Sequence, residues 1–287
     1  MAEAWTVLRL LTWCRDYFST RGIDTPRLDA EVLLAHVLTV DRLGLYLRYD
    51  QPLTAEELKR FRELVQRRGQ REPVAHLVGT KEFFGLSYHT DKRALVPRPE
   101  TELLVETVLA ELPADEPQLV AEVGVGSGCL IVTLLVKRPA WTGIATDISE
   151  QALNLAAGNA DELNVAKRLE LLTGDCLAGV DGPVAAVVSN PPYIAGADCE
   201  TAMPEAALYD PRIALDGGTD GLDIIRRLIA QAPTVLAPGG LLALECGAGQ
   251  APTIQALLTE DGRYEPSATR RDLAGIERVI VARTKES

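Results

Sequence analysis

Hydrophobic side chains in the first seventy residues recur every three or four positions, which is the spacing of an amphipathic helix. The first such segment carries Val7, Leu8, Leu11, Cys14 and Phe18 on one face. A second helix is expected to begin at Pro26, a residue favoured in a first helical turn. A third follows Thr54, where Glu57 completes the pattern of a capping box. The sequence therefore predicts a small all-helical domain over residues 1–73.

The pattern changes over residues 74–96. Two short runs of aromatic and β-branched residues surround a glycine there, which predicts a β-hairpin linking two domains. The segment that follows begins with prolines and continues as an amphipathic helix, with Pro99 near its first turn.

From residue 118 onward, short buried strands alternate with helical segments. The expected strands cover residues 118–123, 142–147, 169–175, 183–192, 241–247 and 277–283. This alternation is typical of a mostly parallel sheet covered by helices on both faces. The sequence thus predicts an α/β domain over residues 97–287, with its ligands at the carboxyl ends of the strands.

The first of these strands runs into a glycine-rich turn, Gly124-Val125-Gly126-Ser127-Gly128, that opens a helix. Glycines let the backbone turn tightly and let a ligand approach it closely. A dinucleotide-binding fingerprint would place its third glycine one position later, where Cys129 stands. The next strand ends at Asp147, 19 residues after Gly128, where a carboxylate can accept both hydroxyls of a ribose. S-adenosylmethionine fits this pattern best, because it has a ribose, an adenine and no phosphate.

A second motif, Asn190-Pro191-Pro192-Tyr193, directly follows a buried strand. Two prolines fix the backbone and remove two N–H donors, which leaves carbonyl oxygens to accept hydrogen bonds. Asn190 adds a side-chain carbonyl and Tyr193 a flat ring. Together these groups suit a planar NH₂ group whose nitrogen is to be methylated, through positioning and electrostatics and without a covalent enzyme intermediate.

Composition narrows the class of protein. The 287 residues carry 29 basic and 41 acidic side chains, a net charge of −12. Residues 1–72 hold 12 basic and 11 acidic residues, so the acidity lies in the remainder. Such a surface gains little from phosphate attraction, so stable nucleic-acid binding is not expected.

Five cysteines without a CxxC pair, together with three unclustered histidines, predict neither disulfides nor a metal site. With no signal peptide or membrane span expected either, the sequence indicates a cytoplasmic protein.

Taken together, the motifs resemble those of the peptide chain release factor glutamine N5-methyltransferases, the HemK/PrmC family. The segments that carry the resemblance are GVGSG, Asp147, NPPY at 190–193, VPRPETE at 96–102 and DLAGIER at 272–278. The resemblance implies a class I S-adenosylmethionine-dependent methyltransferase fold, Rossmann-like with a mostly parallel seven-stranded sheet. It also implies that the helical N-terminal domain binds the partner. The implied substrate is the glutamine of the GGQ motif in class I release factors.

The resemblance also assigns site residues. The methyl-donor site falls on Gly124, Val125, Gly126, Ser127, Gly128, Asp147, Cys176 and Asn190. The catalytic and substrate-glutamine site falls on Asn190, Pro191, Pro192 and Tyr193. Glu122 stands where the family usually has an aspartate, and Cys176 where some relatives carry an aromatic side chain.

Two alternatives stay open at this point. The NPPY motif alone is shared with adenine-N6 DNA methyltransferases and some RNA guanine methyltransferases, and the residues by themselves do not choose between a glutamine amide and an adenine. A non-catalytic scaffold with a cofactor-type fold is the second, although the intact NPPY and glycine loop speak against it.

Overall fold

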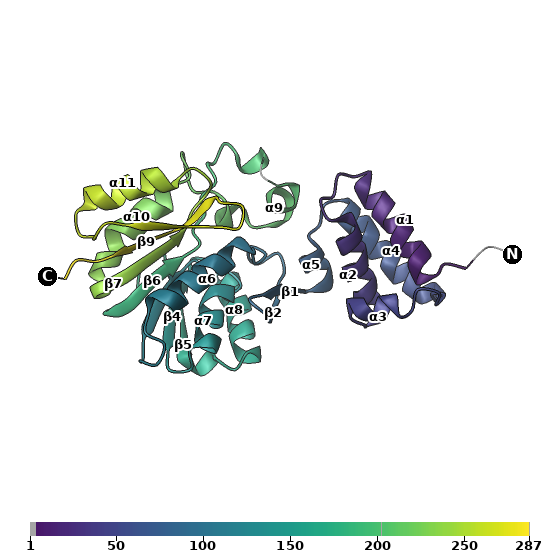
Figure 1. The fold of residues 1–287 in the computed structure, drawn as a ribbon, viewed down its shortest axis with the longest axis horizontal. Helices are drawn as coiled ribbons and strands as arrows, with labels where there is room; N and C mark the ends of the chain where they lie inside the picture. The colour runs from purple at the N-terminus through teal and green to yellow at the C-terminus, as the bar shows by residue number, and fades with distance from the viewer. Residues whose placement is uncertain (1–3, 202, 287) are drawn as a thin grey trace. The chain divides into compact units, whose positions relative to one another are not determined.

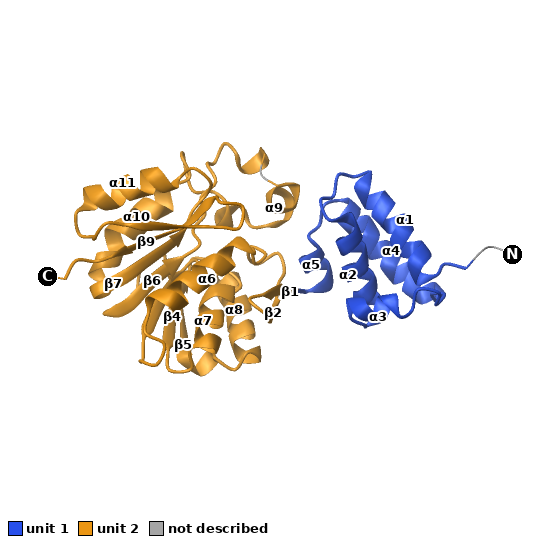
Figure 2. Cartoon of the chain, viewed as in Figure 1, with its two compact units in different colours: residues 1–80 blue, residues 81–287 orange. Residues whose placement is uncertain are grey.

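The computed structural model describes residues 4–201 and 203–286 and divides into two compact units, Met1–Thr80 and Lys81–Ser287 (Figure 2). Figure 1 labels most of the helices and strands. In the residues that the structure describes, no helix combines the length and apolarity needed to cross a membrane.

The first unit is helical, as predicted. Its helices are α1 (Val7–Ser19), α2 (Pro26–Leu38), α3 (Arg42–Tyr46), α4 (Ala55–Gly69) and α5 (Val74–Val78). The capping box at the start of α4 is present: Thr54 Oγ1 accepts the Glu57 N–H at 3.3 Å, and Glu57 Oε2 accepts the Thr54 N–H at 2.7 Å. Buried side chains from all five helices form one core.

The hairpin is shorter than the predicted 74–96. Residues Val74–Val78 form α5, which begins after Pro73 and ends at Gly79 in the left-handed conformation. The strands β1 (Thr80–Phe83) and β2 (Leu86–His89) follow, and both turn residues between them have positive φ, 52° at Phe84 and 74° at Gly85. That backbone matches the twist of a two-residue hairpin.

The second unit contains a seven-stranded sheet, as predicted. Its strands are β3 (Leu119–Val123), β4 (Thr142–Asp147), β5 (Leu169–Thr173), β6 (Val184–Ser189), β7 (Leu236–Glu245), β8 (Ala268–Arg271) and β9 (Glu277–Arg283). Their order is β5-β4-β3-β6-β7-β9-β8. The first five are parallel, while β9 is antiparallel to both β7 and β8.

Helices cover both faces of this sheet (Figure 1). They are α6 (Glu100–Glu111), α7 (Cys129–Lys137), α8 (Glu150–Glu162), α10 (Asp223–Gln231) and α11 (Ala251–Asp261). The short helix α9 (Pro204–Tyr209) packs through Ala206 in a separate small cluster. Successive strand residues point to opposite faces. Val120 accordingly packs in one core with α6, α7 and α8, whereas Ala121 packs in another with α10 and α11. Burial on both faces explains why the parallel strands read as continuous apolar runs.

The strand order also positions the motifs. Strands β3 and β6 are neighbours although they are not consecutive, so the sheet reverses its order between them. Ligands in open α/β sheets bind at such a point, beyond the carboxyl ends of the strands. The glycine loop follows β3 and the NPPY tetrad follows β6, so the topology brings the two motifs together.

Candidate functional site

The glycine loop connects β3 to α7 in a backbone that requires glycine. Gly124 and Gly128 have φ of 73° and 79°, in the left-handed region that L side chains rarely adopt. A Cβ at Gly128 would also lie 3.1 Å from the Cβ of Ala156 in α8, whereas a Cβ at Gly124 would meet no atom within 4 Å. Gly128 therefore serves close helix packing, and Gly124 leaves space beside the loop.

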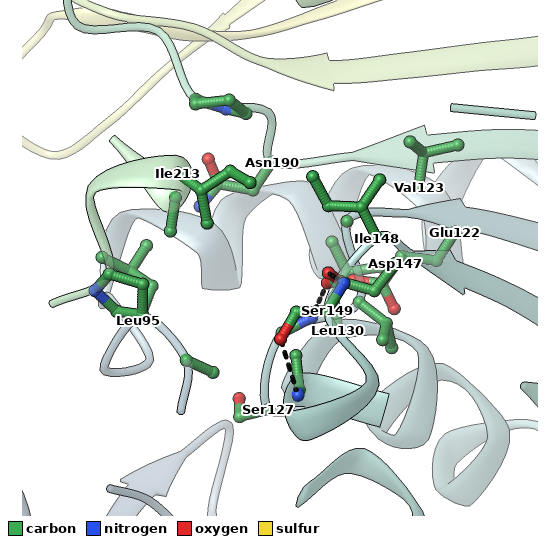
Figure 3. A pocket seen from close by; sticks show the side chains of 18 of the residues that line it. Leu95, Glu122, Val123, Ser127, Leu130, Asp147, Ile148, Ser149, Asn190 and Ile213 are labelled. Carbon is green, nitrogen blue, oxygen red and sulfur yellow. Dashed lines mark hydrogen bonds between the residues drawn. The ribbon is translucent and has the colours of Figure 1, made fainter. Parts of the chain in front are cut away.

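Asp147, the last residue of β4, is tied to this loop. Its Oδ2 accepts the Gly126 N–H at 3.0 Å, and its Oδ1 accepts the Ser149 N–H at 2.9 Å. Ser149 in turn caps α8, accepting the Ala152 N–H at 3.2 Å (Figure 3). A carboxylate has about four acceptor positions, so the two backbone donors fix its direction and leave capacity for ligand hydroxyls.

A cavity of about 230 Å³ lies between these elements. The predicted cofactor residues that line it are Gly124, Val125, Gly126, Ser127, Asp147, Cys176 and Asn190. Figure 3 shows Asp147 and Asn190 around this same space. Gly128 does not line the cavity, because it faces α8.

The far wall of the cavity follows β5. Both Asp175 and Cys176 line it. Cys176 is buried and has φ of 53°, and its backbone carbonyl accepts the Thr146 hydroxyl at 2.6 Å. Asp175 pairs with Arg227 at 2.7 Å, and this hydrogen bond lowers the pKa of Asp175 below its usual value.

The NPPY tetrad begins directly after β6. Ser189, the last residue of that strand, donates its hydroxyl to the carbonyl of Val123 at 2.7 Å and so ties β6 to β3. Asn190 and Pro192 line the first cavity. A neighbouring cavity is lined by Asn190, Pro191 and Tyr193. Asn190 therefore lines both cavities, so that a ligand in the first cavity and a ligand in the second could both contact it.

Two buried carboxylic acids near these cavities were missed by the sequence reasoning as site residues. Glu122 lines the first cavity, and its Oε2 accepts the Ile131 N–H of α7 at 3.0 Å. Glu245, the last residue of β7, accepts the Thr101 hydroxyl at 2.7 Å. Burial raises the pKa of Glu122 well above its ordinary value and that of Glu245 to about 7.

Thr101 is the third residue that sequence reasoning did not assign. It belongs to VPRPETE, lies in the first turn of α6 and lines the first cavity. Its Oγ1 accepts the side-chain N–H of Asn190 at 3.0 Å. The VPRPETE motif could have drawn attention to Thr101. Its residues alone, however, do not predict that the first turn of α6 contacts Asn190, the residue after β6.

The five cysteines are free thiols, and four of them are buried. In the described part of the chain, no group of three or more His, Cys, Asp or Glu residues could hold a metal ion.

Two family models match the chain. Residues 9–79 match the PrmC N-terminal domain, and residues 99–218 match the methyltransferase small domain. Both matches fall on the units described above, since one lies within the helical unit and the other within the sheet unit.

Among known proteins, the chain is similar to the release factor glutamine methyltransferase of Geobacter sulfurreducens, with 40% identity over 282 residues and 98% of each chain covered. It is 43% identical over 262 residues to the release factor glutamine methyltransferase of Cereibacter sphaeroides, covering 91% of this chain and 92% of that protein. The crystal structure of a methyltransferase from Pyrococcus furiosus has the same fold. It superposes with a TM-score of 0.53 at 18% identity and covers 71% of this chain and 92% of that one.

Proposed function

The chain belongs to the family of release factor glutamine methyltransferases, and we propose that it transfers a methyl group from S-adenosylmethionine to the side-chain amide nitrogen (N5) of the glutamine in the GGQ motif of class I peptide chain release factors. Similarity over nearly the full length of named relatives supports the activity. The observation that carries the site assignment is the position of Asn190, on the wall shared by two cavities.

The first cavity suits the methyl donor. Asp147 offers acceptor positions for the two ribose hydroxyls, with its direction fixed by Gly126 and Ser149. Apolar side chains such as Val125, Leu130 and Ile148 line the cavity and suit an adenine ring. S-adenosylmethionine supplies an electrophilic methyl group on a sulfonium centre. The glycine loop, Asp147, Cys176 and Asn190 would hold it.

The second cavity suits the substrate amide. An amide nitrogen is a poor nucleophile because its lone pair is delocalised into the carbonyl group. Asn190 Oδ1 and a backbone carbonyl of the proline pair would accept its two N–H groups, which raises electron density on nitrogen and aims it at the methyl group. Pro191, Pro192 and Tyr193 shape this site, with the tyrosine ring beside the amide plane. The work is positioning and electrostatic stabilisation, and we assign no step to a metal.

The partner is a protein and not a nucleic acid, since the sheet unit carries the excess of acidic residues. Release factors act on ribosomes in the cytoplasm, so an enzyme that methylates them would work there and would not need to bind a membrane.

The helical domain, residues 1–73, supplies a second contact for the release factor. It carries none of the site residues, and α1 exposes about half of the Leu8 and Trp13 side chains. Trp13→Ala should raise KM for the release factor and leave the affinity for S-adenosylmethionine unchanged. An unchanged KM would remove α1 from the contact.

One assay tests the function itself. Purified protein is incubated with labelled S-adenosylmethionine and a class I release factor, beside the same factor with its GGQ glutamine changed to alanine. Label should enter only the first factor. Equal labelling of both would refute the glutamine assignment, and labelling of duplex DNA in place of either would support an adenine-N6 methyltransferase.

A further inference from the structure

The side-chain amide of Asn190 can be held in two ways. It can present either its oxygen or its NH₂ group to the substrate, because the two ends of an amide have nearly the same shape. Only the oxygen can accept a hydrogen bond from the substrate N–H. A site that depends on Asn190 therefore needs something that selects one orientation.

The structure contains a chain of contacts that does so. The Nδ2 of Asn190 donates to Thr101 Oγ1 at 3.0 Å, and Thr101 Oγ1 donates to Glu245 Oε2 at 2.7 Å. The three residues come from distant parts of the sequence: the loop after β6, the first turn of α6 and the end of β7. All the oxygen and nitrogen atoms involved lie within ordinary hydrogen-bonding distance.

We propose that Glu245 and Thr101 are positioning residues that lock the Asn190 amide with its oxygen toward the substrate. This inference rests on the proposed role of Asn190 as the acceptor for the substrate amide. Thr101 and Glu245 act through Asn190 and do not themselves contact the reacting atoms.

The direction of the chain follows from proton counting. An ionised carboxylate only accepts, so the single hydroxyl proton of Thr101 must point to Glu245. The oxygen of Thr101 then has only lone pairs to offer Asn190. Asn190 must therefore donate a hydrogen bond from its NH₂ group to Thr101, which leaves its Oδ1 to accept one from the substrate. Among the described residues, Oδ1 accepts no hydrogen bond from the protein.

Protonation of Glu245 would release the lock. A protonated carboxyl can donate to Thr101, whose proton is then free to point at Asn190 and to favour the reversed amide. Glu245 is 1% exposed, and burial is the main reason that its pKa is raised to about 7. The titratable and charged groups that interact electrostatically with it are Glu100 on α6, Cys129 on α7, Tyr193, Cys246 and Arg278 on β9. Of these, Glu100 raises the pKa further, and Arg278 and the Tyr193 hydroxyl lower it.

The test is a double-mutant cycle in the full chain, measured as methyl transfer to the release factor, with circular dichroism as the check on folding and calorimetry for the S-adenosylmethionine affinity. Thr101→Val removes the link and should lower kcat about tenfold, the scale of one lost positioning hydrogen bond, with donor affinity within twofold. Thr101→Ser should restore most of the rate. Asn190→Ala should lower kcat by roughly 10²–10³. Adding Thr101→Val to Asn190→Ala should cost nothing more, since the link then has nothing left to hold.

Thr107→Val is the matched control. Thr107 is a buried threonine on the same helix, and its hydroxyl bonds to the Leu103 carbonyl at 2.7 Å. It should keep the wild-type rate. Glu245→Gln should lower kcat several-fold at pH 8 and should remove the decline in rate below about pH 7 that we expect of the wild type.

The outcomes separate the two claims. If Asn190→Ala is fully active, the proposed role of Asn190 fails. If Asn190→Ala is impaired while Thr101→Val turns over normally, only the lock fails. Full additivity of the two changes, or an acid decline that persists in Glu245→Gln, would also overturn the lock. Should Thr101→Val fail to bind the donor because it is misfolded, the pH profile of Glu245→Gln decides alone.

Discussion

Both units bury carboxylic acids that pair with arginine, as Asp210 does with Arg98 at 2.7 Å in the sheet unit, but two buried acids of the sheet unit have no such partner among the described residues. In the helical unit, Glu31 is 2% exposed and receives hydrogen bonds from Arg27, Arg42 and Tyr46. Asp29 pairs with Arg68 at 2.7 Å. In the sheet unit, Glu122 and Glu245 are equally buried. Within the part of the chain that the structure describes, their hydrogen bonds come from neutral donors only.

The difference appears in the pKa values. Burial works to raise the pKa of Glu31, but the hydrogen bonds from Arg42, Arg27 and Tyr46 together lower it below its ordinary value. Burial dominates at Glu122 and Glu245 and raises both. A paired acid is a structural element, whereas an unpaired buried acid is costly to ionise and tends to mark a functional site. Glu122 lines the first cavity, and Glu245 accepts hydrogen bonds from Thr101 in the wall of the first cavity and Tyr193 in the wall of the second, which fits this interpretation.

The largest effect should follow from breaking a pair. Arg68→Met would leave the Asp29 carboxylate buried, with the Thr25 hydroxyl as its remaining side-chain partner at 2.7 Å. We expect the free energy of unfolding of the helical unit to fall by about 3–5 kcal/mol. Hydrogen exchange measured by mass spectrometry should show faster exchange in α1, α2 and α4.

The double change Arg68→Met with Asp29→Asn is the control. It removes both charges and should recover much of the loss. If exchange in the single variant matched that of the wild type, the pair would not be the stabilising element that its geometry suggests.

A smaller effect, opposite in sign, is expected at Glu245. Its pKa is about 7 in the folded chain, against an ordinary value of 4.5, so folding favours the protonated form. Its contribution to stability is full below about pH 4.5 and is lost as the pH rises through 7. Relative to Glu245→Gln, the wild type should therefore lose up to about 3 kcal/mol of unfolding free energy between pH 5 and pH 8.

Urea unfolding of both proteins at the two pH values measures this difference. The same gap at both values would mean that Glu245 titrates normally. The expected result also means that the ionised form of Glu245, which would orient Asn190, is the form that destabilises the fold.

Local patterns predicted most of the fold. The capping box at Thr54 and the apolar run of each strand depend only on the residues of their own segment. The sequence therefore located α4 and six of the seven strands, the antiparallel β9 among them. Strand β8 was not located, because Ala268–Arg271 is a polar edge strand with no buried residue. The hairpin was predicted to begin at residue 74, which is too early, because the five residues of α5 are too few to show helical spacing.

The site was predictable only where one segment carries it. Asp147 and Asn190 each stand at the end of a strand, so spacing and motif were enough to find them. Thr101 and Glu245 become candidate site residues only through their hydrogen bond to each other, which joins positions 144 residues apart in the sequence. No local pattern reports such a contact, and Glu245 reads simply as the end of an apolar strand.

Asp147 belongs to neither group of acids, since it is only partly buried and has no arginine partner among the described residues. It is half-buried, its partners are two backbone N–H groups in place of an arginine, and it keeps acceptor positions for a ligand. Asp147→Ala should weaken S-adenosylmethionine binding by about 1.5–3 kcal/mol, or roughly 10- to 150-fold in Kd, the range of charge-assisted hydrogen bonds. Calorimetry measures it, with Asp161→Ala, an exposed acid on α8, as the control that should bind normally. A Kd within twofold of the wild type would remove Asp147 from the S-adenosylmethionine site. Its role would then be structural, joining the glycine loop to the start of α8 through its hydrogen bonds.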